Sequence, residues 1–164
     1  MTAADRASQD GSAADRLARS CAEVMWADDE ASRRLGMTLE ATGSGRATVA
    51  MAVRNDMTNG HGTAHGGFIF ALADSAFAFA CNSHNERTVA QTCDIVFVAP
   101  AYEGDVLVAD ATERHRFGRN GIYDIRVVCE ERVIAEFRGH SRTVGGALVD
   151  PAAVDAVPTD QGPT

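Results

Sequence analysis

Long apolar runs and targeting signals are absent from this sequence. No stretch approaches the roughly 20 consecutive apolar residues that a membrane-spanning helix needs. The opening segment, MTAADRASQDGSAADRLARS, has no apolar core of the kind a secretory signal needs, and its acidic residues argue against a transit peptide. We therefore expect a cytoplasmic protein without a membrane partner.

Clusters of basic residues and paired cysteine motifs are also lacking. The formal net charge is −8 and the pI is about 5.0, whereas binding to nucleic-acid phosphates needs clustered Lys and Arg. We therefore expect no nucleic-acid partner. The cysteines form no CxxC pair, so we interpret them as buried small side chains and not as disulfides or zinc ligands. They are Cys21, Cys81, Cys93 and Cys129.

The sequence does hold enough apolar residues for one domain. Of its 164 residues, 45% are hydrophobic, which suits a single compact domain with its own core. The first residues are polar and rich in Ala, and the sequence from Gly145 onward is rich in Gly, Pro and Asp. We predict a flexible N-terminus over 1–11, one domain over 12–146 and a flexible C-terminal tail over 147–164.

The spacing of apolar residues predicts helices and strands in an α+β order. Helical spacing predicts a first helix from Ala13 to Asp29. The segment 67–82 is apolar on nearly every face of a helix, so we expect it to be buried on nearly every side. Alternating runs predict strands at 37–41, 46–53, 89–98, 105–117, 122–130 and 132–143, the last three as an antiparallel meander. A curved antiparallel sheet wrapped around the one long helix, the hotdog fold, satisfies this pattern best.

A single carboxylate stands out in the apolar helix. Asp74 lies in the middle of it, where burying a charge is costly unless something requires it. One interpretation is a structural acceptor for Ser or backbone N–H groups. The other is a general base or nucleophile, because perturbed, partly buried carboxylates are candidates for these roles.

The same helix opens with His65-Gly66-Gly67. Backbone without side chains at a helix N-terminus offers unpaired N–H groups and the positive end of the helix dipole, which suit a polarised thioester carbonyl. An ordinary Gly-rich helix start is the alternative. Gly66 and Asp74 lie about 12 Å apart along one helix, whereas a nucleophile must come within about 3–3.5 Å of the carbon that it attacks. If both act on one carbonyl, they come from two subunits, which predicts a homodimer with shared active sites.

Several motifs together resemble the PaaI-type hotdog thioesterases. They are Asn59-Gly60-His61, His65-Gly66-Gly67, Leu72-Ala73-Asp74-Ser75-Ala76-Phe77-Ala78 and Ala80-Cys81-Asn82-Ser83. The similarity continues through Gly118–Asp124 and from Phe137 to Gly146, so it covers residues 20–146, nearly the whole predicted domain.

This resemblance implies a role for particular residues. Asp74 matches the catalytic carboxylate, and Gly66 matches the residue whose N–H polarises the thioester carbonyl. Asn59 and His65 match positions that line the site and orient substrate or water. The family hydrolyses acyl-CoA thioesters, prominently phenylacetyl-CoA and its hydroxylated forms. It needs no metal or other cofactor, since coenzyme A is part of the substrate, and it is usually a tetramer built from dimers.

Further residues complete the predicted site, and several have simpler interpretations. We expect Gly67 and the turn Gly118-Arg119-Asn120 to bind substrate, because such a turn of a hotdog protein commonly meets CoA phosphates. A solvated turn is the alternative. Asn59 could instead form a left-handed turn and His65 could cap the helix. The phenylalanines of the helix are expected to be mostly core, with one or two bordering the acyl pocket. They are Phe68, Phe70, Phe77 and Phe79.

The sequence therefore predicts an acyl-CoA thioesterase that acts on small aromatic acyl groups. The enzymatic alternative is a hotdog dehydratase or hydratase, which needs an Asp–His or Glu–His pair, whereas the helix offers Asp74 without a His at comparable depth. The other alternative is a non-catalytic acyl-CoA-binding module. Such a module would have no use for a buried carboxylate.

Overall fold

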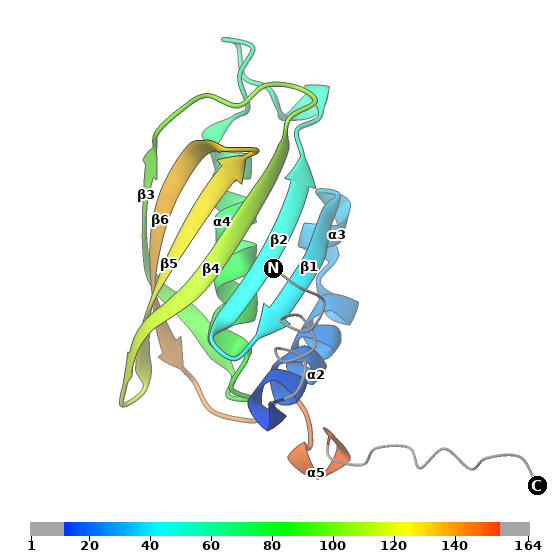
Figure 1. Cartoon of the computed structure of the whole chain (residues 1–164), viewed down its shortest axis with the longest axis vertical. Helices are drawn as coiled ribbons and strands as arrows, with labels where there is room; N and C mark the ends of the chain where they lie inside the picture. The colour runs from blue at the N-terminus through cyan, green and yellow to red at the C-terminus, as the bar shows by residue number, and fades with distance from the viewer. Residues whose placement is uncertain (1–11, 155–164) are drawn as a thin grey trace, which may run out of the picture.

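The computed structural model describes residues 12–154, which form a curved sheet around one long helix (Figure 1). The helices are α2 (Ala13–Asp28), α3 (Glu30–Arg34), α4 (Gly66–Asn82) and α5 (Pro151–Val154), with a 3-10 turn at Asn55–Met57. The strands are β1 (Met37–Gly43), β2 (Arg46–Ala52), β3 (Thr88–Phe97), β4 (Val106–Phe117), β5 (Asn120–Cys129) and β6 (Arg132–Thr143). The predicted α+β hotdog arrangement is confirmed.

All strand pairs of the sheet are antiparallel, and the strand order is β1-β2-β4-β5-β6-β3. The predicted meander is confirmed, because β4 pairs with β5 and β5 with β6. Strand β3 then lies beside β6, so β1 and β3 are the edges of the sheet. Helices α2 and α3 pack against β1 (Figure 1). Each edge strand has one side without a neighbouring strand, and β3, with 10 residues, is longer than β1, with 7.

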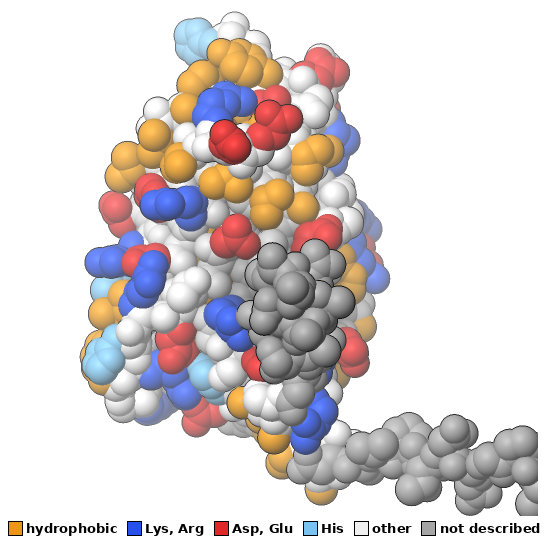
Figure 2. Space-filling view, in the orientation of Figure 1, with side chains coloured by type: hydrophobic (Ala, Val, Ile, Leu, Met, Phe, Trp, Pro, Cys, Tyr) orange, Lys and Arg blue, Asp and Glu red, His pale blue; other side chains and the backbone are white. Residues whose placement is uncertain are grey.

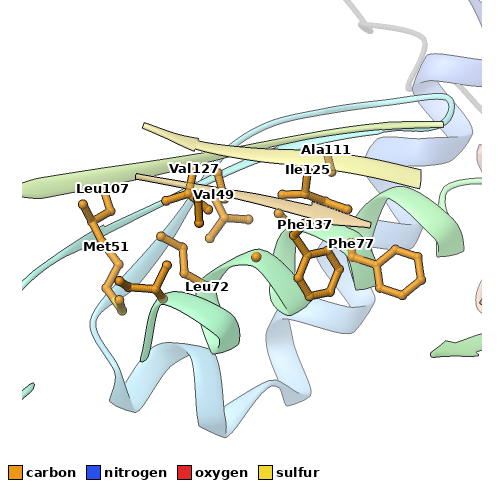
Figure 3. Close-up of a cluster of buried hydrophobic side chains, with 14 of the residues drawn as sticks. Val49, Met51, Leu72, Phe77, Leu107, Ala111, Ile125, Val127 and Phe137 are labelled. Atoms are coloured by element: carbon orange, nitrogen blue, oxygen red, sulfur yellow. The ribbon is translucent and has the colours of Figure 1, made fainter. Parts of the chain in front are cut away.

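The core lies between α4 and the concave face of the sheet. Leu72 is fully buried and points toward Val49, Met51 and Leu107 of the sheet (Figure 3). At the other end of α4, the ring of Phe77 lies so close to β6 that a Cβ on Gly139 would be 2.7 Å from it. Close packing of this kind fixes α4 against the sheet and so fixes the position of Asp74.

The convex face of the sheet is polar. Arg114 and Arg138 both form ion pairs with Asp124, at 2.8 and 2.6 Å. Figure 2 shows charged side chains of both signs intermixed over the molecule in this view. One buried and one solvated face are common in antiparallel sheets. No helix within residues 12–154 is long and apolar enough to cross a membrane.

The predicted first helix, Ala13 to Asp29, is confirmed as α2 to within one residue, and the short helix α3 that follows it after Asp29 was not predicted. The backbone of Asp29 leaves the helical conformation, with φ −84° and ψ 79°, and its side chain accepts a hydrogen bond from the Ser32 N–H at 2.9 Å. Asp competes for backbone groups in this way, which is why it ends one helix and begins another. The Ser32 hydroxyl then lies 2.8 Å from the Ser75 hydroxyl, next to Asp74 on α4.

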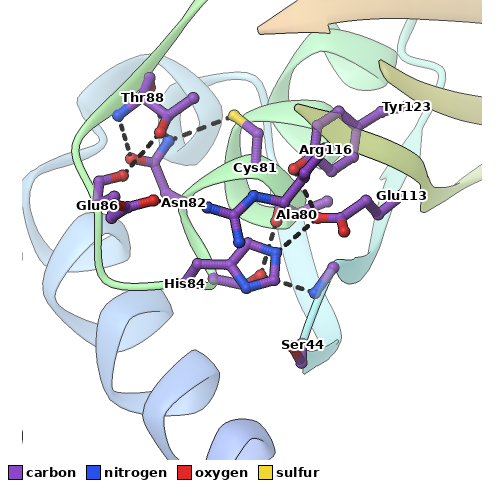
Figure 4. A network of polar contacts seen from close by, with 12 residues as sticks. Ser44, Ala80, Cys81, Asn82, His84, Glu86, Thr88, Glu113, Arg116 and Tyr123 are labelled. Atoms are coloured by element: carbon purple, nitrogen blue, oxygen red, sulfur yellow. Dashed lines mark hydrogen bonds and ion pairs between the residues drawn. The ribbon is translucent and has the colours of Figure 1, made fainter. Parts of the chain in front are cut away.

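The C-terminal end of α4 is held by polar side chains (Figure 4). The Asn82 amide donates to the carbonyl of Thr88 and its oxygen accepts from the Thr88 N–H, both at 2.9 Å. Glu113 lies 2.6 Å from the His84 ring nitrogen and accepts a hydrogen bond from the Tyr123 hydroxyl at 2.8 Å. These bonds attach α4 to β3, β4 and β5.

The first part of the predicted C-terminal tail is attached to the domain. The side-chain oxygen of Asn85 accepts hydrogen bonds from the N–H groups of Leu148 and Val149, at 2.8 and 2.9 Å. The remainder of that tail, 155–164, and the predicted flexible N-terminus, 1–11, lie outside the described residues. For these two segments, flexibility stays a prediction.

Candidate active site

The N-terminus of α4 begins with a histidine cap. The Nδ1 atom of His65 accepts a hydrogen bond from the Gly67 N–H at 3.0 Å. A neutral His65 that accepts at Nδ1 carries its proton on Nε2, which is free to donate outward from this exposed ring. The capping interpretation of His65 therefore holds, and it is compatible with a contact between Nε2 and a substrate.

Gly66 is the residue of the helix start whose N–H stays available. The Gly67 N–H is used by His65 and the Phe68 N–H by the His65 carbonyl, at 3.0 Å each. Within residues 12–154, the Gly66 N–H has no acceptor. It lies at the positive end of α4 and beside a pocket of about 430 Å³ formed by Thr63, Ala64, Gly66, Ile69 and Phe97–Pro100. A carbonyl oxygen in this pocket could accept its hydrogen bond.

Asp74 lies half-buried at the middle of α4 without a hydrogen-bond donor among the described residues. Burial raises the pKa of its carboxyl group above the ordinary value. Burial and the charge of Asp74 together also raise the pKa of the Cys81 thiol to about 12 and raise the pKa of the Cys93 thiol. Because Cys93 lies on β3, Asp74 is on the side of α4 that faces this strand. The interpretation of Asp74 as a structural acceptor finds no partner here.

Asn59 organises its own loop. Its side-chain oxygen accepts hydrogen bonds from the N–H groups of His61 and Thr63, at 2.9 and 3.3 Å, and its amide donates to the Thr63 hydroxyl at 3.0 Å. The interpretation of Asn59 as a left-handed turn residue is wrong, since Asn85 and Glu130 are the non-glycine residues with positive φ in the described part of the chain. Asn59 shapes the loop through its side chain instead. Asn59 reaches the pocket through Thr63, which lines it next to Gly66.

The predicted substrate-binding turn lies at the other end of the sheet. Gly118, Arg119 and Asn120 connect β4 to β5, with Gly118 at φ +56°, a conformation that favours glycine. Arg119 donates from Nε and Nη2 to the carbonyl of Thr143, at 3.0 and 2.8 Å. Figure 1 places this hairpin opposite the N-terminus of α4. A single chain thus does not bring Arg119 and Gly66 together.

The helical phenylalanines do not line the pocket beside Gly66. Phe77 and Phe79 are buried in the core, and Phe68 and Phe70 pack partly against it. The aromatic wall comes instead from Phe97, at the end of β3. Our sequence reasoning missed this residue, although an aromatic side chain at a strand end shortly before Pro100 was a visible signal.

All cysteines are free thiols, and within residues 12–154 no group of three potential ligands could hold a metal ion. The site therefore consists of a helix terminus with one available N–H, an apolar pocket beside it and an unpaired carboxylate on the same helix. Inside a curved antiparallel sheet, these features define a hotdog-fold thioesterase.

Comparison with known proteins agrees with this class. The family model described as the thioesterase superfamily matches residues 61–136. The acyl-coenzyme A thioesterase PaaI of Escherichia coli K12 is 41% identical over 132 residues, 80% of this chain and 94% of that protein. The chain belongs to the thioesterase superfamily and, within it, to the PaaI family of thioester hydrolases.

Solved structures agree with this assignment. The E. coli PaaI protein from the phenylacetic acid degradation operon superimposes with a TM-score of 0.80 at 40% identity, over 81% of this chain and 97% of that one. The TT0310 protein of Thermus thermophilus superimposes with a TM-score of 0.69 at 39% identity, over 71% of this chain and 98% of that one.

Proposed function

We propose that this protein hydrolyses CoA thioesters of small aromatic acids to the free acid and CoA, in the cytoplasm and in active sites shared by two subunits. The observation that carries the proposal is the half-buried Asp74, which no described residue neutralises or hydrogen-bonds. A carboxylate kept in that state costs stability. Its use as a base or nucleophile gives a reason for that cost.

The chemistry needs two groups on opposite sides of one carbonyl carbon. The Gly66 N–H and the positive end of α4 stabilise the oxyanion that forms when the thioester carbonyl is attacked. Asp74 either accepts a proton from the attacking water or attacks the carbon itself, forming an anhydride that water then hydrolyses. In both routes the C–S bond breaks, the CoA thiolate leaves and takes up a proton, and no metal or other cofactor takes part.

Two subunits supply these groups because one helix cannot. Strand β3 has a free edge, and its exposed apolar side chains include Val89, 48% exposed. A long open edge strand with apolar side chains favours pairing with another strand. If β3 pairs antiparallel with the β3 strand of a second copy, the two α4 helices point in opposite directions. Asp74, on the β3 side of its helix, then faces the Gly66 end of the other.

The same pairing gives the β4–β5 turn a role. Arg119 lies at the Thr88 end of β3, since Thr88 pairs with Thr143 and the Thr143 N–H bonds to the Arg119 carbonyl. Gly66 lies at the Phe97 end of the same strand. Antiparallel pairing therefore brings the turn of one subunit toward the pocket of its partner, where it suits CoA phosphates. We propose a tetramer of two such dimers, on the family resemblance.

The aromatic acyl group is supported by the pocket and by the relatives. Apart from Thr63, the side chains that line the pocket beside Gly66 are apolar, and one of them is aromatic, as is common in small-molecule sites. The E. coli relative comes from the phenylacetic acid degradation operon.

Release of free thiol from phenylacetyl-CoA tests the proposed function. We expect the purified protein to release one CoA thiol for each phenylacetic acid formed. A hydratase would release no thiol from an unsaturated acyl-CoA while changing its absorbance, and a non-catalytic module would bind CoA esters without turnover. Either result would contradict the proposal.

A further inference from the structure

We propose that Phe97 selects the acyl group: its ring forms a wall of the acyl pocket over Gly66 and favours planar aromatic groups over saturated groups of the same size. This inference rests on the proposed thioesterase function and adds to it the residue that decides between substrates.

The ring of Phe97 covers the backbone of Gly66. A Cβ atom built on Gly66 would lie 2.9 Å from Cζ of Phe97 and 3.3 Å from both of its Cε atoms. The Cε atoms are only slightly farther than Cζ, which means that the face of the ring, and not its edge, is turned toward the glycine. Any other residue at position 66 would collide with the ring, so the glycine at this position accommodates Phe97.

The position of Phe97 is held from both sides. Its backbone pairs with Ala135 of β6, and the N–H groups of Val98 and Ala99 donate to the carbonyl of Ile134, at 2.8 and 3.3 Å. On the glycine side, the Ala64 N–H donates to the carbonyl of Ala101 at 2.8 Å. The strand end and the helix start are therefore attached to each other, which fixes the distance between the ring and Gly66.

The ring is nevertheless open to a ligand. Phe97 is 52% exposed, although it lies in a pocket whose other side chains are small or aliphatic. An acyl group whose carbonyl reaches the Gly66 N–H must lie against the nearest wall of the same pocket, which is this ring. Aromatic pairs in offset or edge-to-face contact gain stability beyond the area that they bury, equivalent to about 3- to 10-fold in binding.

A matched pair of substrates isolates this contact. Phenylacetyl-CoA and cyclohexylacetyl-CoA have the same carbon skeleton and differ in the planarity and π electrons of the ring. For each protein variant, we would measure the ratio of kcat/KM for the two substrates. In Phe97→Leu we expect the preference for phenylacetyl-CoA to fall by about 3- to 10-fold, whereas Phe97→Tyr keeps the ring face and should keep the preference.

Val96→Ala is the control, because Val96 is 58% exposed on the same strand but lines the convex face of the sheet. It should leave the ratio unchanged. The inference is wrong if Phe97→Leu leaves the ratio within twofold of wild type, or if Val96→Ala lowers it equally. Failure of the proposed function has a different signature, since the wild-type protein would then release thiol from neither substrate.

Discussion

At the scale of single residues, Asp74 differs from the other aspartates whose pKa values are shifted. A backbone N–H bond to Asp15, another to Asp105 and the Arg138 guanidinium beside Asp124 hold the pKa values of these carboxyls below the ordinary range. Burial raises the pKa of Asp74 instead. Partners stabilise the other three side chains as anions, whereas Asp74 has no such partner among the described residues.

Replacing Asp74 by Asn should separate catalysis from stability. We expect kcat to fall by about 10²- to 10⁴-fold, because the base or nucleophile is lost. The melting temperature at neutral pH should stay equal or rise, since the substitution removes a half-buried charge that has no donor. Thiol-release kinetics and thermal melts measure the two effects. Asp94→Asn, an exposed position on β3, is the control; if Asp74→Asn kept wild-type turnover, Asp74 would not be catalytic.

The raised pKa of Asp74 also predicts the pH dependence of activity. The carboxylate must be ionised to act, so kcat/KM should fall as the pH drops through this raised pKa, at a higher pH than for an ordinary aspartate. A pH–rate profile measures this acid limb. A profile that stays flat down to the ordinary pKa range of aspartate would contradict the assignment.

Stability should respond to pH in the opposite sense. Between the ordinary pKa of the unfolded state and the raised pKa of the folded state, the folded protein binds more protons. The free energy of unfolding contributed by Asp74 therefore falls as the pH rises through this window, and the loss is complete above the raised pKa. Urea melts of wild type and Asp74→Asn across this range should show the slope in the difference between them, and parallel curves would refute it.

At the scale of elements, the β4–β5 turn is placed by a contact between strands. The two hydrogen bonds from Arg119 to the Thr143 carbonyl attach this exposed arginine to the end of β6 and do not use its Nη1 atom. The β4–β5 turn thus holds the Arg119 guanidinium at one end of the sheet. In the proposed dimer, the N-terminus of the partner's α4 lies near this end.

Arg119→Ala should weaken binding of the CoA nucleotide. We expect KM for phenylacetyl-CoA to rise about 10-fold with little change in kcat, because a charged hydrogen bond to phosphate is lost. With the N-acetylcysteamine thioester, which lacks the nucleotide, KM should not change. Arg126→Ala, whose guanidinium pairs with Glu136 on the convex face, is the control. Equal effects on both thioesters would show that Arg119 acts only on the fold.

At the scale of the whole molecule, the proposed site needs two chains, because one chain cannot bring its own Gly66 N–H and Asp74 carboxylate to the same carbonyl. The available Gly66 N–H and the Asp74 carboxylate lie about two turns apart on a single rigid helix. In the dimer that we propose, a second copy pairs along the open edge of β3 and supplies the other group.

Mixed dimers test this sharing. Gly66→Pro removes the N–H at the first position of α4, which tolerates proline. Phe97→Ala in the same subunit removes the neighbouring phenyl ring and so makes room for the ring of the introduced proline. Paired with an Asp74→Asn subunit through two affinity tags, this double variant should regain up to about half of the wild-type rate, because one of two sites is intact. Each variant alone should be inactive, and Phe97→Ala alone should remain active. A mixed dimer without activity would mean that the site is not shared.

The sequence by itself determined the features that depend on neighbours along the chain. Apolar periodicity predicted the first helix, the long central helix and the strands, with ends displaced by a residue or two, but it did not predict the short helix α3. The position of Asp74 within α4 and the glycine start of that helix were also visible. Each follows from local backbone preference and from the burial of one face, which a few consecutive residues decide.

Only the tertiary structure decided which groups stay unpaired and what lies beside them. The free Gly66 N–H follows from the His65 ring taking the Gly67 N–H, and the lack of a donor for Asp74 follows from the packing around α4. The Phe97 ring reaches Gly66 only because β3 passes beside β6 and closes the sheet over the helix. Contacts between distant segments depend on how the sheet curves around α4, and no local pattern in the chain encodes that closure.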